Sequence, residues 1–416
     1  MPSTRSDHVL GPELEGRRGV LPNQHLVRLI EAGAIAAPTE SPIPPTNIQP
    51  ASLDLRLGPV AYRLQCSFLP GRDPVDKRLN YLKMGEIDLR GEGGALEIGR
   101  PYLIPLQESL RLPTDVRAKA NPKSSTGRAD VFTRVITDHS YSFDEIASGY
   151  SGSLYLEVVP LSFSVRIREN LSLNQLRLAV GRTSLVDEEL RSAHLGSPLL
   201  YEDGRTVPVD ELPLSDGLLL GVNLQGGKQT KMGYRAKESP PLLDMTQLRG
   251  AAIDKYWERI RTTRPDCIIL KSKRFYLLMS NEAVCIPPDL AAEMTAYDPT
   301  SGELRTHYAG FFDPGFGYDR QGQFSGSTAA LEVRAHDVDF MIEHGQRVCK
   351  LTFERMLEEP SLLYGETLGS NYQRQTETVG KHFKLPARKP EGSSAEALAD
   401  DLESEQLPLF DVGGVS

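Results

Sequence analysis

The sequence is poor in patterned cysteine and in long apolar runs, and each shortage excludes a class of protein. Four cysteines in 416 residues are scattered without a Cys-x-x-Cys spacing, which argues against a disulfide framework and against a zinc knuckle. No apolar run approaches the roughly 20 residues that span a bilayer, and residues 1–18 lack the apolar stretch of a signal peptide. We therefore expect a cytoplasmic protein without a membrane partner.

The sequence also lacks an excess of positive charge. Lysine and arginine number 47 against 56 aspartates and glutamates, a net charge of -9, so broad electrostatic binding of nucleic acid is disfavoured. We expect any anionic ligand to be small and held by a local cluster of cations. With 39% hydrophobic residues, the chain is long enough for two or three domains with apolar cores.

Turn-forming residues and short alternating segments predict a mainly β fold with few short helices. The chain has 30 prolines and 36 glycines, and segment 53–58 alternates leucine with charged residues as a half-buried strand does. One predicted helix spans residues 23–31, with Asn23 as its candidate cap and Gly33 as its stop. A second region with helical spacing of apolar residues lies at 253–260.

An internal repeat gives the domain organisation. Residue 101 aligns with residue 275, a separation of 174, and this register places Glu108 on Glu282 and Asp115 on Asp289. Segments 151–153 and 325–327 also align, as do 156–158 and 331–333 after one inserted residue. We predict β domains at about 19–182 and 212–384, joined by a connector at 183–211. The tail, 385–416, has few aromatic and many acidic or small residues, so we expect it to be disordered.

Three polar clusters could carry chemistry. Segment 121–128 holds two cations and three hydroxyls in one turn, a set that can bind phosphate oxygens or a developing oxyanion, although an ordinary polar turn is the commoner interpretation. Glu157 and Glu332 occupy matching strand positions in the two repeats, on the face opposite the neighbouring leucines. Strand glutamates are usually only solvated. The third cluster, 364–375, is taken alone a polar loop.

The order and spacing of these clusters resemble the dCTP deaminase family of the dUTPase-like superfamily. That family has a strand similar to segment 49–58, then an Arg-Ser-Ser-x-x-Arg loop, an Asp-Pro-Gly-Trp-Ser-Gly turn leading to Leu-Glu, and a C-terminal Tyr followed by Lys-Tyr-x-x-Gln. Segment 123–128 matches the loop, and both Glu157 and Glu332 match the glutamate of Leu-Glu. The tyrosines and glutamine of segment 364–375 match the closing segment.

The resemblance implies a tandem pair of distorted jelly-roll or β-barrel domains and hydrolytic deamination of dCTP to dUTP and ammonia, feeding dTMP synthesis. It implies catalytic roles for Ser124, Arg128, Glu157 and Glu332, and substrate binding by Lys123, Ser125, Asp313, Tyr364, Tyr372 and Gln375. It also implies a homo-oligomer built on trimers. Zinc deaminases carry His-x-Glu and Pro-Cys-x-x-Cys, which this sequence lacks, so we expect no zinc and no metal bound by side chains. Mg²⁺ would enter on the triphosphate.

The departures from the family pattern predict one site shared by unequal repeats. Repeat 1 keeps the loop but has Ala-Ser-Gly-Tyr at 147–150, whereas repeat 2 keeps Asp-Pro-Gly-Phe at 313–316 but lacks the loop at 298–302. We therefore predict that repeat 1 supplies Ser124, Ser125 and Arg128, that repeat 2 supplies Asp313 and Glu332, and that Tyr364 and Gln375 close over the ligand. A trimer of stacked rings would place repeat 1 beside repeat 1 of the next subunit, and would instead pair the loop of repeat 1 with Glu157. Asn371 replaces the family's closing lysine.

Two other functions and one partner stay open. A dUTPase or a bifunctional deaminase-diphosphatase would use a water activated by aspartate at the α-phosphate. A non-catalytic nucleotide-sensing or partner-binding protein would bind its ligand without chemistry. In the tail, segment 406–410 resembles the pentapeptide that docks on the bacterial sliding clamp, through Gln406, Leu407, Leu409 and Phe410. An incidental apolar patch in an acidic tail is the commoner interpretation of that segment.

Overall fold

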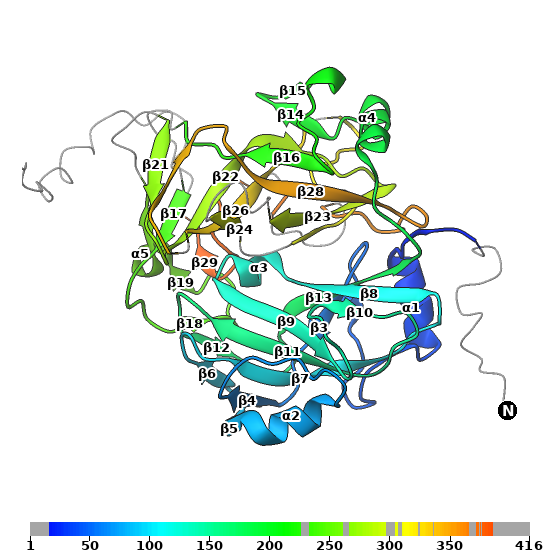
Figure 1. Cartoon of the computed structure of the whole chain (residues 1–416), viewed down its shortest axis with the longest axis vertical. Coiled ribbons are helices and arrows are strands. Elements are labelled where there is room, and N and C mark those ends of the chain that lie inside the picture. Colours follow the sequence, from blue (N-terminus) through cyan, green and yellow to red (C-terminus); the bar gives the residue numbers. More distant parts are fainter. Residues whose placement is uncertain are drawn as a thin grey trace, which may run out of the picture. The chain divides into compact units, whose positions relative to one another are not determined.

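Strands dominate the computed structural model, as the sequence predicts (Figure 1). The structure describes residues 16–225, 233–260, 266–296, 304–306, 310–322, 325–335, 337–365, 372–373, 375 and 377–385. Within these residues the helices are short: α1 (Asn23–Glu31), α2 (Val75–Leu82), α3 (Ser124–Gly127), α4 (Asp187–Gly196), α5 (Ile253–Tyr256) and the 3₁₀ turns η2 (Pro45–Asn47) and η3 (Val209–Glu211). None of the described helices is long and apolar enough to cross a membrane.

Repeat 1, residues 19–182, is built mainly from two sheets. One runs β1–β13–β8–β10 with β3 on β13, and the other runs β5–β4–β7–β11–β9 with β2 on β7. The strands are β1 (Gly19–Val20), β2 (Ile35–Ala36), β3 (Leu53–Arg56), β4 (Val60–Leu64), β5 (Lys83–Asp88), β6 (Gly94–Leu96), β7 (Tyr102–Arg111), β8 (Val116–Pro122), β9 (Val131–Thr137), β10 (Glu145–Ile146), β11 (Ser151–Pro160), β12 (Val165–Ile167) and β13 (Ser172–Val180).

Repeat 2, residues 212–384, repeats this plan after the connector, which contributes β14 (Leu200–Glu202) and β15 (Arg205–Thr206). One sheet runs β16–β28–β23–β25, and the other holds β15–β14–β22–β17–β20 with β26 on β22 and β24 on β26. The strands are β16 (Leu218–Gly221), β17 (Gly233–Ala236), β18 (Leu243–Asp244), β19 (Ala251–Ala252), β20 (Trp257–Arg259), β21 (Cys267–Leu270), β22 (Phe275–Val284), β23 (Leu290–Ala296), β24 (Leu304–Thr306), β25 (Phe311–Phe312), β26 (Ser327–Ala335), β27 (Phe340–Glu343), β28 (Arg347–Arg355) and β29 (Phe383–Lys384).

The two repeats have matching topology and register. The β3–β13–β8–β10 arrangement corresponds to β16–β28–β23–β25, and the β7–β11 pair corresponds to β22–β26. Glu157 lies opposite Leu103 and Glu332 lies opposite Leu277, so the two glutamates occupy the same place in their sheets. The predicted fold, mainly β and built from two tandem β domains, is confirmed.

A continuous apolar core joins the repeats. Phe163 of repeat 1 packs edge-to-face on Trp257 of repeat 2, with ring centroids 5.1 Å apart, and Trp257 packs on Phe383 at 5.8 Å. Strand β12 of repeat 1 also pairs in parallel with β18 of repeat 2. Each aromatic pair contributes about 0.5–1.5 kcal/mol beyond the burial of its area. The repeats therefore form one compact unit up to Lys384.

Two local predictions were wrong. Of the second predicted helix only α5 forms, and Trp257 begins β20, where it pairs with Ala236 in the large sheet of repeat 2. The sheet supplies hydrogen bonds that outweigh the weak helical pattern of this short segment. Strand β3 was predicted to be half buried, but all four of its residues are buried, because its charged side chains have partners inside the protein.

The predicted helix at 23–31 is confirmed, but its capping residue was wrong. Asn23 is the first helical residue and Pro22 precedes it at the cap position. Nδ2 of Asn23 instead donates a hydrogen bond to the hydroxyl of Ser361 in repeat 2, at 2.7 Å. The tail beyond residue 385, with the predicted clamp-binding segment 406–410, lies outside the described residues.

Candidate active site

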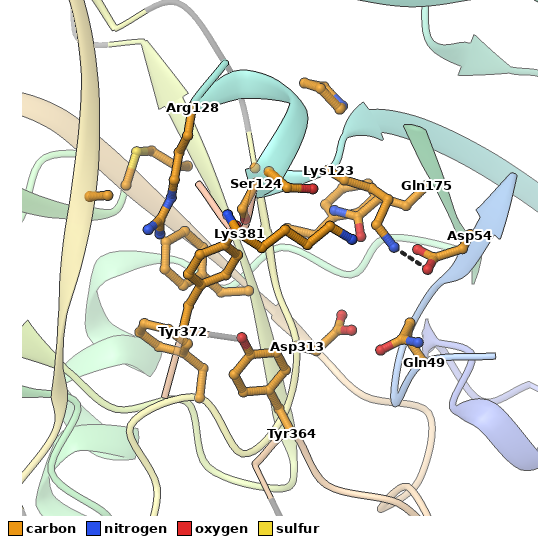
Figure 2. Close-up of a pocket in the computed structure, with 18 of the residues that line it drawn as sticks. Gln49, Asp54, Lys123, Ser124, Arg128, Gln175, Asp313, Tyr364, Tyr372 and Lys381 are labelled. Carbon is orange, nitrogen blue, oxygen red and sulfur yellow. Dashed lines mark hydrogen bonds and ion pairs between the residues drawn. The ribbon is translucent and has the colours of Figure 1, made fainter. Parts of the chain in front are cut away.

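A cavity of about 350 Å³ lies where repeat 1 meets repeat 2 (Figure 2). Its size is in the range that holds a small organic ligand. Nine of the ten predicted site residues line it: Lys123, Ser124, Ser125 and Arg128 from repeat 1, and Asp313, Glu332, Tyr364, Tyr372 and Gln375 from repeat 2. The tenth, Glu157, does not. The pocket therefore combines the groups that the composite-site hypothesis assigns to the two repeats.

The polar turn of repeat 1 forms one wall of the cavity. Strand β8 ends at Pro122, Lys123 is extended, and α3 begins at Ser124. At the end of α3, Gly127 is so close to Glu332 that a Cβ atom at this position would lie 2.4 Å from Oε2 of the glutamate. A Cβ atom at this position would push aside the Glu332 carboxyl group or the turn, so the two repeats approach each other closely here.

Glu332 is the buried acid of the cavity. It lies on β26 with 9% of its surface exposed. Burial raises the pKa of its carboxyl group to about 8, the nearby Arg128 guanidinium opposes this shift, and the Asp130 carboxylate adds to it. Near neutral pH the group is therefore mostly protonated, and a carboxyl with a pKa close to the working pH can both give and accept a proton.

Arg128 faces the same part of the cavity. It is 4% exposed, and its guanidinium carbon lies 3.8 Å from the ring centroid of Tyr372. Nη1 donates to the carbonyl oxygen of Thr378 at 3.4 Å, whereas the buried Nε has no hydrogen-bond partner among the described residues. A buried donor without a partner is costly, so this guanidinium is well suited to bind a ligand oxygen.

Asp313 is held from the other repeat. Nη2 of Arg177 donates to its Oδ1 at 3.0 Å and the Ser52 hydroxyl donates to its Oδ2 at 3.3 Å. Arg177 is 2% exposed and also pairs with Glu354 at 3.0 Å. Burial nevertheless raises the pKa of the Asp313 carboxyl above its ordinary value. Repeat 1 therefore fixes the orientation of a carboxyl group that repeat 2 presents to the cavity.

The closing segment covers the cavity from repeat 2. The Tyr364 backbone amide donates to the carbonyl oxygen of Pro314 at 2.9 Å, so this tyrosine is tied to the turn that carries Asp313. Nε2 of Gln375 donates to the carbonyl oxygen of Thr328 at 2.6 Å, and its buried Oε1 accepts no hydrogen bond from the described residues. Asn371 and segment 298–302 lie outside the described residues.

Glu157 lies outside this cavity, although it is the positional twin of Glu332. It is fully buried, and its Oε1 accepts hydrogen bonds from Nε and Nη2 of Arg134 at 3.1 and 2.5 Å. The Arg134 guanidinium also stacks on Phe143, 3.6 Å from the ring centroid. Glu157 is therefore engaged in an internal ion pair of repeat 1, away from the serine loop.

Several cavity residues carried no prediction from the sequence. They include Asp54, Gln175, Phe311, Phe316 and Lys381. Asp54 pairs with Lys123. The sequence did hold a sign of its role, because Asp54 alternates with leucines in a strand that resembles one of the family, and a charged side chain on such a strand can face a ligand. Lys381 follows the closing segment by six residues and no motif marks it. Figure 2 shows Lys381 extending towards Lys123 and Asp54.

Two β domains that share a cavity lined by cations and a buried carboxyl of raised pKa define a protein suited to acid-base chemistry on a small anionic ligand. Family models identify its class. The N-terminal domain of 2'-deoxycytidine 5'-triphosphate deaminase matches residues 17–182, and the C-terminal domain of the same family matches residues 186–383. The chain therefore belongs to the dCTP deaminase family.

Individual relatives agree with this assignment. The crystal structure of 2'-deoxycytidine 5'-triphosphate deaminase from Agrobacterium tumefaciens is 42% identical, with a TM-score of 0.77, and the match covers 85% of this chain and 100% of that one. A curated "dCTP deaminase, dUMP-forming" from Methanobrevibacter smithii is 28% identical over 139 residues. That match covers 32% of this chain and 66% of the relative, just under two thirds of its length.

Proposed function

We propose that this protein hydrolyses dCTP to dUTP and ammonia, in a site shared by its two repeats. The observation that carries the proposal is the contact between Glu332 of repeat 2 and the Ser124–Arg128 turn of repeat 1. A buried carboxyl with a raised pKa beside hydroxyl and guanidinium donors can supply the proton transfers and the oxyanion contacts of deamination at C4 of cytosine. The family and the similarity to a dCTP deaminase structure support the substrate.

Glu332 can carry every proton of the reaction. Its carboxyl group first gives a proton to ring N3, and the resulting carboxylate takes a proton from the water whose oxygen bonds to C4. The carboxyl then protonates the amino group while it accepts the proton of the new hydroxyl. The C4–N bond breaks, ammonia leaves, and Glu332 ends protonated as it began. Its pKa of about 8 suits this alternation near neutral pH.

The other cavity residues would orient the reactants. Ser124 and Arg128 supply donors for the attacking water and for the oxygen of the tetrahedral intermediate. Asp313, held by Arg177, and the closing residues would bind the base and the sugar: Tyr364, Tyr372 and Gln375. Lys123 and Ser125 would bind the phosphates. A site that fixes its groups through both repeats has little reorganisation to complete before reaction.

We propose that the reaction needs no zinc and that Mg²⁺ arrives on the triphosphate. Among the described residues no group of three or more His, Cys, Asp and Glu side chains could hold a metal, whereas triphosphate oxygens are natural Mg²⁺ ligands. Asp54 lines the cavity beside Lys123, and its buried Oδ1 has no hydrogen-bond partner in the described part of the chain. This oxygen could therefore contact the hydrated ion. Ammonia release after treatment with a zinc-selective chelator, compared with and without added Mg²⁺, tests both parts.

A bifunctional reaction that ends at dUMP is the second candidate, because one relative is named as dUMP-forming. It would require a water activated by an aspartate at the α-phosphate. Incubation of the purified protein with dCTP, with dUTP, dUMP and pyrophosphate resolved over time, separates the two. We expect dUTP and ammonia to accumulate together, and dUMP as the first product would refute the simple deaminase.

A matched pair of substitutions tests the proposed site. Glu332→Gln and Glu157→Gln remove the same carboxyl group from twin positions, one in the cavity and one in the Arg134 ion pair. We expect ammonia release to be lost only in Glu332→Gln. Measurable dCTP binding by the wild-type protein without any ammonia would instead favour a nucleotide-sensing protein.

Assembly, location and tail binding stay predictions. We propose a trimer-based homo-oligomer of the cytoplasm that binds no nucleic acid, and light scattering of the purified protein gives its mass directly. For the tail, retention on purified sliding clamp is compared between the wild type and the Leu409→Ala/Phe410→Ala variant. Equal retention of the two proteins would eliminate the clamp contact.

A further inference from the structure

Lys381 is a cation of the cavity that the proposed chemistry leaves unused. It lies just before β29 and lines the cavity. Its backbone is fixed on both sides, since its amide donates to the Tyr372 hydroxyl at 3.3 Å and its carbonyl oxygen accepts from the Arg249 amide at 2.9 Å. No carboxylate of the described residues lies within ion-pair distance of its Nζ. A held, half-buried ammonium without such a partner is suited to an anion.

The neighbours of Lys381 make this end of the cavity cationic. Burial lowers the pKa of Lys381, the nearby Lys123 ammonium lowers it further, and Asp54 opposes the shift. Two lysines therefore share a single carboxylate, which already pairs with Lys123. The other aspartate that lines the cavity, Asp313, pairs with Arg177. Bringing an anion to this end relieves the repulsion between the two ammonium groups.

We propose that Lys381 and Lys123 together bind the terminal phosphates of the nucleotide, with Lys381 supplying the cation that position 371, an asparagine, cannot. The proposal rests on the proposed function for the identity of the nucleotide, but not for the chemistry of the subsite, which is that of a polyphosphate. Figure 2 shows the Lys381 side chain running from the Arg128 side of the cavity to the Lys123–Asp54 pair. A triphosphate placed along it would leave the base near Arg128 and Glu332.

Inorganic tripolyphosphate tests the subsite without any reaction. We compare the wild type with Lys381→Met and Lys381→Arg by calorimetric titration, with Lys384→Met as the matched control, since Lys384 is exposed and three residues further along the chain. Losing one charge-assisted contact should weaken binding about tenfold or more in Lys381→Met. Lys381→Arg should keep most of the affinity, and Lys384→Met all of it.

Kinetics with dCTP then connect the subsite to the nucleotide. In Lys381→Met the KM for dCTP should rise by about the same factor as the tripolyphosphate Kd, while kcat stays near the wild-type value and dCMP binding does not change. A merely structural lysine would affect dCMP and dCTP alike. Unfolding midpoints equal to that of the wild type show that each variant is folded.

The two proposals fail in different ways. If the wild-type protein binds tripolyphosphate through Lys381 but releases no ammonia from dCTP, the phosphate subsite stands and the deaminase proposal is refuted. Equal tripolyphosphate affinity in the wild type and folded Lys381→Met, or no binding by the wild type at all, overturns the subsite whatever the activity. Equal losses for dCMP and dCTP overturn it as well.

Discussion

The contact between Gly127 and Glu332 allows a severe test of the shared site with a single methyl group. A Cβ atom at residue 127 would lie 2.4 Å from Oε2 of Glu332 and 2.8 Å from its Cδ. Carbon and oxygen atoms without a bond between them prefer separations of about 3.5 Å, so the turn or the carboxyl group must move by about 1 Å. Displacements of this size in a catalytic group cost on the order of a hundredfold in rate.

Stability should change much less than activity in Gly127→Ala. Overpacking costs typically about 1–3 kcal/mol, and alanine returns about 1 kcal/mol because it is the better helix former in α3. We therefore expect a loss of about 0–2 kcal/mol in the free energy of unfolding. The rate of ammonia release should fall about a hundredfold, while the protein stays folded at the assay temperature.

Gly196→Ala is the matched control for this substitution. Gly196 also lies at the end of a helix, α4, and a Cβ atom there would have no neighbour within 4 Å. In this variant ammonia release should be unchanged, and the free energy of unfolding should stay the same or rise by up to about 1 kcal/mol, because only the helix preference of alanine acts. A rate within twofold of the wild type in Gly127→Ala would refute the close approach of the turn to Glu332.

A double substitution assigns the effect to the right partner. Glu332→Asp shortens the side chain by one methylene, which makes room for the added methyl group. If the clash is with the carboxyl group, Gly127→Ala should destabilise the Glu332→Asp protein less than it destabilises the wild type. Residues in contact commonly couple by about 0.5–3 kcal/mol. Additive changes in unfolding free energy would mean that the methyl group clashes with something else.

Three further predictions concern the carboxyl groups around the site. Glu332→Gln should lower the rate of ammonia release by about a hundredfold to ten-thousandfold, whereas Glu157→Gln should keep the rate and lose about 1–3 kcal/mol of unfolding free energy in denaturant titrations, because the buried Arg134 pair is weakened. The pKa of Glu332 is raised on folding to about 8 from an ordinary 4.5, so the native state holds more protons than the unfolded state between these values. Wild-type stability should therefore fall from pH 4.5 to 8 relative to Glu332→Gln and run parallel to it above pH 8; parallel curves throughout would contradict the raised pKa. Arg177→Lys should raise the KM for dCTP several-fold without changing the pH optimum, because Asp313 loses its guanidinium contact while Glu332 is untouched; an unchanged KM would show that Arg177 does not position Asp313.

The repeat could be detected in the sequence because equivalent strand positions in the two copies carry the same type of side chain. Glu108 and Glu282 align, and the structure gives them equivalent partners: Glu108 accepts from the Arg56 amide and Nε at 2.7 and 2.6 Å, and Glu282 accepts from the Gly221 amide at 2.9 Å and pairs with Arg347. Both carboxyl groups are buried and need donors, and the same residue type stands at the same strand position in each repeat. Local features with that requirement, and the repeat that they mark, could be predicted from the sequence.

What the sequence could not predict depends on contacts between distant segments. The apolar spacing around Trp257 fits a helix or a strand, and only pairing with β17 decides between them. Asp54 was placed on the exposed face of β3, because no residue near it in the chain indicates that Lys123, 69 residues away, is its partner. Lys381 lines the cavity because the chain near Gly380 packs against repeat 1. The residue types of this segment do not predict that packing.

The twin glutamates show why a matched motif does not identify the working residue. Glu157 and Glu332 have the same strand position and the same opposite neighbour type, leucine. At position 157 the adjacent strand supplies Arg134, whose guanidinium donates directly to the carboxyl group and pairs with it. At position 332 the other repeat supplies Gly127, which brings the helix backbone close without providing a bonded cation, and Arg128 is turned onto Tyr372. Burial then dominates, the pKa rises, and the carboxyl keeps a proton that it can exchange.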